Sequence, residues 1–251
     1  MTREERVTLE ATRRLAPVAL DVGGAVVMRY PEAPDIPMLN RVVGLGVARP
    51  ATEDDVDAVL EALGTGTSFY VAVAPEAEPE ELPRWLEARG LEPGWGWMSF
   101  RRGIDVPETR PSPLRLEEVR TPEQTAAFAR IVRIGFGLPE TLDPALARAP
   151  EAGWRCWLAL DGDEPVSTAG MLVSEGAAYL SFAATLSEHR GKGAQSLLLA
   201  ERIRVAGELG CDVVTTETGE LRDDRPSSSY RNLLRAGFEE VAVTANWLGR
   251  R

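Results

Sequence analysis

The chain has 251 residues, of which 44% are hydrophobic and 27% are charged, and its formal net charge is −11. This length suits one large domain or two small ones, and no apolar run in the sequence approaches the length of a membrane span. The acidic excess argues against nucleic-acid binding, which needs a basic face, and mildly favours a cationic substrate. The charged N-terminal residues do not form a secretory signal, so we expect a cytoplasmic location.

Residue types that often carry metal or nucleophilic chemistry are scarce. The chain has two cysteines and one histidine, and they do not form a cluster with metal-ligand spacing, so no metal site is expected. Cys156 and Cys211 lie in apolar, strand-like sequence and are interpreted as small buried hydrophobic residues. His189 lies in a charged loop, which favours a solvated role over a catalytic one.

In the first half of the chain, the sequence predicts a small α/β unit. Hydrophobic spacing and breaker residues indicate a polar helix up to about residue 17, strands at 24–29, 40–47, 68–74 and 96–101, and helices at 53–63 and 80–89. The first of these two helices has the clearest start, because the capping hydroxyl of Thr52 precedes three acidic residues, and Gly64 ends it.

A change in composition separates the two halves. Between Arg102 and Leu114 the sequence reads RGIDVPETRPSPL, which is rich in proline and polar residues and is typical of a linker. We therefore expect a domain boundary here, which divides the chain into residues 1–109 and 110–251.

The second half predicts a strand meander followed by strand–helix crossovers. Its expected strands lie at 114–119, 154–160, 165–173, 179–185, 212–216 and 240–247, and its expected helices start near residues 122, 142, 194 and 227. This order indicates a mixed α/β sheet with helices on both faces.

The two halves share a helix, glycine and strand signature. The segment LEARGLE at 86–92 resembles LRAGFE at 234–239, and each is followed by a tryptophan and paired arginines. We interpret this as a degenerate tandem duplication, although two unrelated units of an α/β protein explain it nearly as well. If the halves are repeats, the first has lost its anion site, because Pro50 and the cap Thr52 stand where glycines would be needed.

The stretch from Ala177 to Leu209 contains the clearest functional signal. A short buried strand is followed by Gly191 and Gly193 and then by an amphipathic helix. The first backbone N–H groups of a helix are unpaired and carry partial positive charge, so this end can bind a phosphate. The two glycines let the backbone approach such a phosphate without a Cβ in the way.

Three kinds of glycine loop compete for this stretch. The P-loop of nucleoside triphosphatases is excluded, because Lys192 is followed by Gly193 instead of a serine or threonine. A dinucleotide-binding fingerprint would be completed by Ser196 instead of glycine or alanine, and the preceding meander is the wrong context for it. The third is the pattern R-x-x-G-x-G/A, which is written here as Arg190-Gly191-Lys192-Gly193-Ala194-Gln195.

With this loop, residues from about Leu114 to Trp247 resemble the GNAT superfamily of acyl-CoA N-acyltransferases. A second motif, Ser229-Tyr230-Arg231-Asn232 followed by Ala236-Gly237-Phe238, is similar to the S-x-R-N…G-F pattern of many members. The resemblance implies a mixed, mostly antiparallel GNAT-type α/β sheet flanked by helices, preceded by a smaller GNAT-like α/β domain. It also implies acetyl-CoA as the acyl donor, a small-molecule amine as the acceptor, and a monomer or homodimer.

The resemblance also implies which residues bind the coenzyme. They comprise the end of the strand, the loop with the start of its helix, and two positions of the later helix: Ala183, Ala184, Thr185, Arg190, Gly191, Lys192, Gly193, Ala194, Gln195, Ser196, Ser229 and Asn232. Two departures from the family pattern stand out. Gln195 places a side chain near the phosphates, and Leu233 stands where many members have a tyrosine that protonates the leaving thiolate.

The reaction that the resemblance implies is direct attack of an amine on the acyl thioester, which requires a base. Glu217 is the first candidate base, followed by Glu220 and Tyr179, and a solvated strand-end role is the alternative for Glu217. Tyr230 is the candidate acid in place of Leu233, with a packing role as its alternative. For the whole chain, the alternative function is a non-catalytic acyl-CoA-binding or regulatory module, and a dinucleotide-binding α/β protein comes third.

Overall fold

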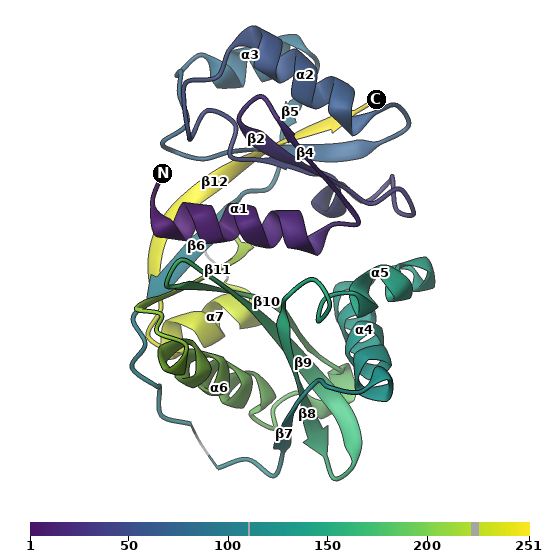
Figure 1. The fold of residues 1–251 in the computed structure, drawn as a ribbon, viewed down its shortest axis with the longest axis vertical. Helices are drawn as coiled ribbons and strands as arrows, with labels where there is room; N and C mark the ends of the chain where they lie inside the picture. Colours follow the sequence, from purple (N-terminus) through teal and green to yellow (C-terminus); the bar gives the residue numbers. More distant parts are fainter. Residues whose placement is uncertain (110, 222–225) are drawn as a thin grey trace. The chain divides into compact units, whose positions relative to one another are not determined.

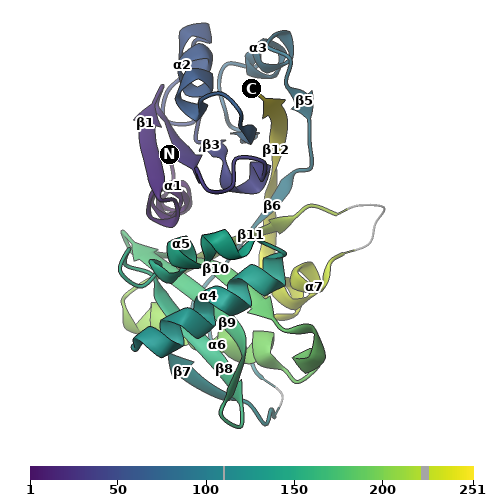
Figure 2. The same ribbon diagram turned by 90° about the vertical axis from the view of Figure 1, so that its right-hand side faces the viewer.

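The computed structural model describes residues 1–109, 111–221 and 226–251, and its helices and strands are labelled in Figure 1 and Figure 2. The chain forms two compact units. Unit 1 comprises Met1–Ser99, Thr218–Arg225 and Val241–Arg251, and unit 2 comprises Phe100–Glu217 and Pro226–Glu240. No helix in the described part of the chain combines the length and the apolar character that a membrane span needs.

Unit 1 is built on a mixed sheet. Its strands lie side by side in the order β1 (Val18–Val22), β2 (Ala25–Arg29), β3 (Arg41–Val43), β4 (Ser68–Val73) and β12 (Glu239–Arg250), and β5 (Glu92–Pro93) also pairs with β12. Its helices are α1 (Arg3–Leu15), α2 (Glu53–Leu63), α3 (Leu82–Ala88) and the 3-10 helix η1 (Pro37–Leu39). The strands β3 and β4 are parallel, and α2 connects them.

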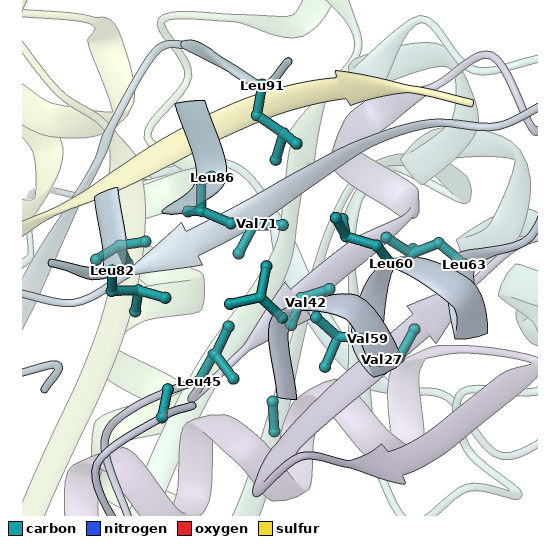
Figure 3. Packing of buried hydrophobic residues seen from close by; sticks show 14 of the residues in the cluster. Val27, Val42, Leu45, Val59, Leu60, Leu63, Val71, Leu82, Leu86 and Leu91 are labelled. Carbon is teal, nitrogen blue, oxygen red and sulfur yellow. The ribbon is translucent and has the colours of Figure 1, made fainter. Parts of the chain in front are cut away.

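Helix α2 supplies one side of the unit 1 core. It buries Val56, Val59, Leu60 and Leu63, which follow the spacing of a single helix face. These side chains pack in one cluster with the sheet residues Val27, Val42, Phe69 and Val71 and with Leu82 and Leu86 of α3 (Figure 3). Burial of each such side chain contributes roughly 1.5–3 kcal/mol before the loss of chain entropy is subtracted.

Two sequence expectations for unit 1 were wrong. The strand expected at 40–47 ends at Val43, because Gly44 and Gly46 take φ values of 87° and 79°, which leave the extended conformation. Strand β1 was not expected at all. It forms a hairpin with β2 through the turn at Gly23 and Gly24, whose φ values are also positive.

Unit 2 contains a second sheet. Its strands lie in the order β11 (Val213–Gly219), β10 (Ala177–Thr185), β9 (Glu164–Ser174), β8 (Arg155–Asp161) and β7 (Arg115–Glu118). Its helices are α4 (Pro122–Phe136), α5 (Asp143–Ala147), α6 (Ala194–Glu208), α7 (Ser228–Arg235) and the 3-10 helices η2 (Glu140–Leu142) and η3 (Ser187–His189).

The strand directions and helix positions of unit 2 agree with the sequence. Strands β7 to β10 are antiparallel neighbours, whereas β10 and β11 are parallel and α6 connects them. Helices α4 and α6 contact β9 and β10 from opposite faces of the sheet (Figure 2). The expected mixed, mostly antiparallel α/β sheet flanked by helices is thus confirmed.

The compact units differ from the two halves of the sequence, 1–109 and 110–251. Strand β12 follows α7 in sequence, yet its residues Ala245–Arg250 pair with Ser68–Val73 of β4 in unit 1. Strand β6 (Trp97–Arg102) begins in unit 1, whereas its residues from Phe100 onward belong to unit 2. Each unit is therefore completed by a strand segment from the other half of the chain.

Candidate functional site

Strand β10 carries an irregularity halfway along its length. Its register with β9 is regular up to Ser181, opposite Gly170, and resumes at Ala184, opposite Thr168. Between these positions Phe182 has a φ of 56°, which is a strained conformation for a bulky side chain. Ala183 is exposed. The strand thus contains a bulge at Phe182 and Ala183.

The same part of β10 also loses its other neighbour. The parallel register of β10 with β11 covers Ala177–Leu180 opposite Val213–Thr216, although β10 continues to Thr185 and β11 to Gly219. Backbone groups beyond Leu180 on this edge are therefore outside the parallel ladder. Such groups need a partner, and a bound ligand can supply it.

The loop after β10 leads into a helix whose N-terminus is not capped. Gly191 and Gly193 have φ values of 83° and 87°, and Gly193 is the N-cap of α6 without any side-chain cap. The N-termini of α1, α2, α4 and α7 are each capped by a serine or threonine side chain. A Cβ on Gly191 would meet no atom within 4 Å. The first backbone N–H groups of α6 are therefore left without a side-chain cap, and an anion could bind to them.

The side chain of Gln195 does not extend over this loop. Its Nε2 donates hydrogen bonds to Thr185 Oγ1 at 3.0 Å and to Ser167 Oγ at 3.2 Å. Gln195 thus ties the first turn of α6 to the ends of β9 and β10, which accounts for an amide side chain at a position where the family pattern has a small residue.

The charged side chains of the loop differ in their partners. Lys192 forms an ion pair with Asp161, and His189 Nδ1 lies 3.2 Å from Asp161 Oδ2. Hydrogen bonds from Lys192 and then His189 lower the pKa of Asp161. The expected solvated role of His189 was wrong, since its side chain is only 14% exposed. Arg190 is exposed and has no ion-pair partner in the described part of the chain.

Two of the three candidate bases lie together. Tyr179 of β10 donates a hydrogen bond from Oη to Glu217 Oε2 of β11 at 3.2 Å, which the register explains because Tyr179 lies opposite Thr215. Glu217 is half-buried. Glu220 belongs to unit 1, where its Oε1 accepts a hydrogen bond from the N–H of Gly96 at 2.7 Å.

Tyr230 lies in the core of unit 2. Its ring contacts Phe100 edge-to-face with centroids 4.9 Å apart, and its hydroxyl donates to Glu240. Burial, followed by the bond to Glu240, raises the pKa of Tyr230 to about 12. In the same helix, Ser229 is exposed and Asn232 is half-buried. Tyr230 therefore packs against its neighbours in the core of unit 2.

The described part of the chain holds no cluster of metal-ligating side chains, and its two cysteines are buried. Within 1–109, 111–221 and 226–251, no group of three or more His, Cys, Asp or Glu side chains could hold a metal ion. Both cysteines are buried and free. Burial raises the pKa of each thiol, which keeps it in the unreactive protonated form.

Several residues around the bulge were not singled out from the sequence. They are the two buried hydroxyls of β9, a buried arginine of α6 and the close-packed glycines of α4 and β9: Ser167, Thr168, Arg202, Gly135 and Gly170. One signal was present in the sequence. Arg202 is spaced four residues after Leu198 and three before Val205, on the buried face of the helix.

Comparison with known proteins supports one family. Residues 123–229 match the family model described as "Acetyltransferase (GNAT) family". No curated protein matches the sequence.

Solved structures share the fold over the whole chain. A GCN5-related N-acetyltransferase from Kribbella flavida is 22% identical, with 100% of this chain and 96% of that chain covered and a TM-score of 0.68. A putative GNAT-family acetyltransferase from Novosphingobium aromaticivorans is 14% identical, with 97% and 96% covered and a TM-score of 0.60. A tandem GNAT protein from the clavulanic acid biosynthesis pathway is 14% identical, with 99% and 88% covered and a TM-score of 0.61. The fold likeness therefore extends to the N-terminal half.

Proposed function

Because the chain carries a domain of the GNAT acetyltransferase family at residues 123–229, we propose that it is an N-acyltransferase that moves an acetyl or acyl group from acetyl-CoA to a primary amine. The observation that carries this proposal is the uncapped start of α6 beside the bulge of β10. These two features offer backbone groups for the two ends of an acyl-CoA, its phosphates and its thioester.

We assign the phosphates of the coenzyme to the loop. The backbone N–H groups of residues 191–196 and the guanidinium of Arg190 would bind the pyrophosphate. Lys192 would contribute less, because Asp161 already neutralises it. Ser229 and Asn232 of α7 would approach the coenzyme, as the resemblance implies.

We assign the pantetheine and the thioester to the exposed edge of β10. Ala183, Ala184 and Thr185 lie where the parallel pairing with β11 has ended, so the backbone groups on this edge that β9 and Ser167 do not hold are available to a ligand. Amide N–H groups at this edge would stabilise the oxyanion of the tetrahedral intermediate.

We propose Glu217 as the base that removes the proton from the attacking amine. The hydrogen bond from Tyr179 would orient its carboxylate, and a proton relay through the tyrosine is compatible with this contact. Tyr230 stays the candidate acid for the leaving thiolate. Its raised pKa makes its hydroxyl a weaker acid than that of an ordinary tyrosine, and its proton is donated to Glu240, which favours a packing role.

The N-terminal half is best explained as a degenerate copy of the C-terminal half. Each half contributes one parallel strand pair connected by a helix, β3–α2–β4 and β10–α6–β11. The start of α2 is filled by its own capping box, in which Thr52 and Asp55 bond each other, and Arg49 pairs with Asp55. This supports a single coenzyme site per chain, in residues 110–251.

The acceptor is proposed only as a class. A net charge of −11 favours a cationic small-molecule amine by long-range attraction. The cytoplasmic location and the monomeric or homodimeric state stay proposals from the sequence.

One experiment separates the enzyme from its rival, a non-catalytic acyl-CoA-binding module. The protein is incubated with acetyl-CoA and a panel of amines, and release of free thiol is measured alongside coenzyme binding. Thiol release that depends on an amine supports the enzyme. Binding without release for every amine supports the module, and absence of binding removes both.

A further inference from the structure

A buried arginine lies beneath the bulge of β10. The side chain of Arg202 in α6 is 1% exposed and has no carboxylate partner among the described residues. Its Nε donates to Leu198 O at 3.0 Å, and its Nη1 donates to Gly170 O at 3.2 Å and Ser181 O at 3.4 Å. A buried cation that is paired only with carbonyl groups is costly to fold, so its place at this point of the sheet calls for an explanation.

Two buried hydroxyl groups of β9 donate hydrogen bonds to the next carbonyl groups along β10. Thr168 Oγ1 donates to Phe182 O at 2.7 Å, and Ser167 Oγ donates to Ala184 O at 2.7 Å. Both hydroxyl-bearing residues are 0% exposed. The carbonyl groups of residues 181, 182 and 184 are therefore each held by a side chain, and only the exposed Ala183 lies between them.

The side chains around the bulge leave it no room to relax. The Phe182 ring lies between Phe128 and Trp154, with centroid distances of 5.3 Å and 5.0 Å. A Cβ on Gly170 would lie 2.6 Å from the Phe182 ring. A strained residue such as Phe182 persists only where its surroundings over-determine it, and the arginine, the hydroxyls and this packing do so together.

The captured carbonyls determine where the amide groups point. In a planar trans peptide the C=O and the following N–H point in opposite directions. When Thr168 holds Phe182 O toward β9, the N–H of Ala183 is directed away from β9. By the same geometry, Arg202 holds Ser181 O on its own side, and the N–H of Phe182 points in the opposite direction.

We propose that Arg202 and Thr168 are positioning residues for the acyl donor. Acting through the bulge, they aim backbone N–H groups of β10 at the acyl carbonyl of bound acetyl-CoA, and the buried guanidinium adds positive charge behind the developing oxyanion. This rests on the proposed acyltransferase function. Donors fixed in advance in a medium of low dielectric are effective in this role, because no reorganisation is needed when the charge forms.

The test uses Thr168→Val, which replaces the hydroxyl with a methyl group, and Arg202→Met, which removes the charge. Thr168→Ser keeps the hydroxyl, and Arg204→Met removes an exposed arginine of the same helix that pairs with Glu201 and Glu208. For each variant we would measure kcat, the affinity for acetyl-CoA, and the affinity for 3′-phospho-ADP, the part of the coenzyme without pantetheine.

For Thr168→Val and Arg202→Met we expect kcat to fall by about tenfold or more, since loss of an oxyanion donor costs about 10²–10³ in rate. Affinity for 3′-phospho-ADP should stay unchanged, and Thr168→Ser and Arg204→Met should behave as the wild type. A purely structural role would lower both affinities together. Wild-type kcat in folded Thr168→Val and Arg202→Met would overturn the proposal.

Three further outcomes are also decisive. If Arg202→Met does not fold, the comparison of Thr168→Val with Thr168→Ser decides alone. If the wild type binds acetyl-CoA but transfers no acyl group, the enzyme proposal fails and the positioning role is judged by affinity: selective weakening of acetyl-CoA in Thr168→Val supports it, and equal affinity to the wild type rejects it. A wild type that binds no acetyl-CoA rejects both proposals.

Discussion

Gly135 of α4 approaches Ala184 of β10 so closely that a Cβ on Gly135 would lie 2.5 Å from the Cβ of Ala184. Real Cβ atoms do not come this near, so the helix and the strand meet at this pair because residue 135 is glycine. The contact lies one residue beyond the bulge, and it couples the packing of α4 to the conformation of the proposed acyl-CoA edge.

Gly135→Ala is therefore expected to lower activity. In an unhindered helix this change would stabilise by about 1 kcal/mol, but here the new methyl group must displace Ala184 and with it the bulge. We expect kcat/KM for acetyl-CoA to fall by about tenfold, measured by thiol release. Arg130→Ala, on the exposed part of the same helix, serves as the control. An active, more stable Gly135→Ala variant would contradict the coupling.

Glu217→Gln tests the proposed base. The amide cannot accept the proton of the amine, whereas its shape is nearly the same, so kcat should fall well over tenfold with acetyl-CoA affinity intact. Tyr179→Phe, which removes the hydrogen bond to Glu217, should give a smaller loss. Glu220→Gln tests the next candidate base, which belongs to unit 1, in the same assay. Unchanged turnover in Glu217→Gln would remove this residue as the base.

The two cations of the loop should differ in their effect on coenzyme affinity. Arg190 has no ion-pair partner in the described residues, while Lys192 is paired with Asp161. Arg190→Gln is therefore expected to weaken acetyl-CoA binding by about fivefold to tenfold, as for loss of one charge-assisted contact, and Lys192→Gln by less. Calorimetry at low and high salt measures both, and the difference should shrink as salt screens the charges. A larger loss in Lys192→Gln would reverse the assignment.

The parts of the structure that the sequence predicted depend on neighbouring residues in the chain. The capped start of α2, the glycine loop before α6 and the strand–helix order of unit 2 all follow from spacing within a few residues. Strand β1 was missed although its turn to β2 is local, whereas the pairing of β12 was missed because its partner is distant in the sequence. β12 pairs with β4 across more than half of the chain, and no local pattern specifies that partner.

The candidate site also contains residues that could be predicted from the sequence and residues that were missed. The loop residues could be singled out because glycine and cation spacing is local, and Glu217 because it follows a predicted strand. Arg202 was missed because an arginine in an amphipathic helix is usually on the solvated face. Its burial is explained by the carbonyl groups of Gly170 in β9 and Ser181 in β10, which are distant in the sequence.

The pH dependence of stability should reveal how the start of α2 is filled. Hydrogen bonding from Arg49 is the main cause that holds the pKa of Asp55 well below its usual range, and the bonds to Thr52 add to it. A carboxyl whose pKa is lowered by folding stabilises the fold above its unfolded pKa of about 4 and loses that contribution as pH falls below it. Thermal unfolding between pH 6 and pH 2 should therefore show a smaller acid-induced loss for Asp55→Asn than for the wild type. Equal losses would mean that Asp55 makes no such contribution.

The filled start of α2 and the open start of α6 together predict one coenzyme site per chain. Calorimetric titration with coenzyme A should give a stoichiometry of one. Gly193→Val should abolish binding, because a branched side chain would stand at the uncapped helix start and would be forced to a φ of 87°. Gly90→Val is the matched control, since Gly90 has a φ of 81° and no atom within 4 Å of an added Cβ, yet it lies in unit 1. It should lose comparable stability and still bind one coenzyme. Two coenzymes per chain would contradict a lost site in the N-terminal half, and normal binding by Gly193→Val would contradict the site itself.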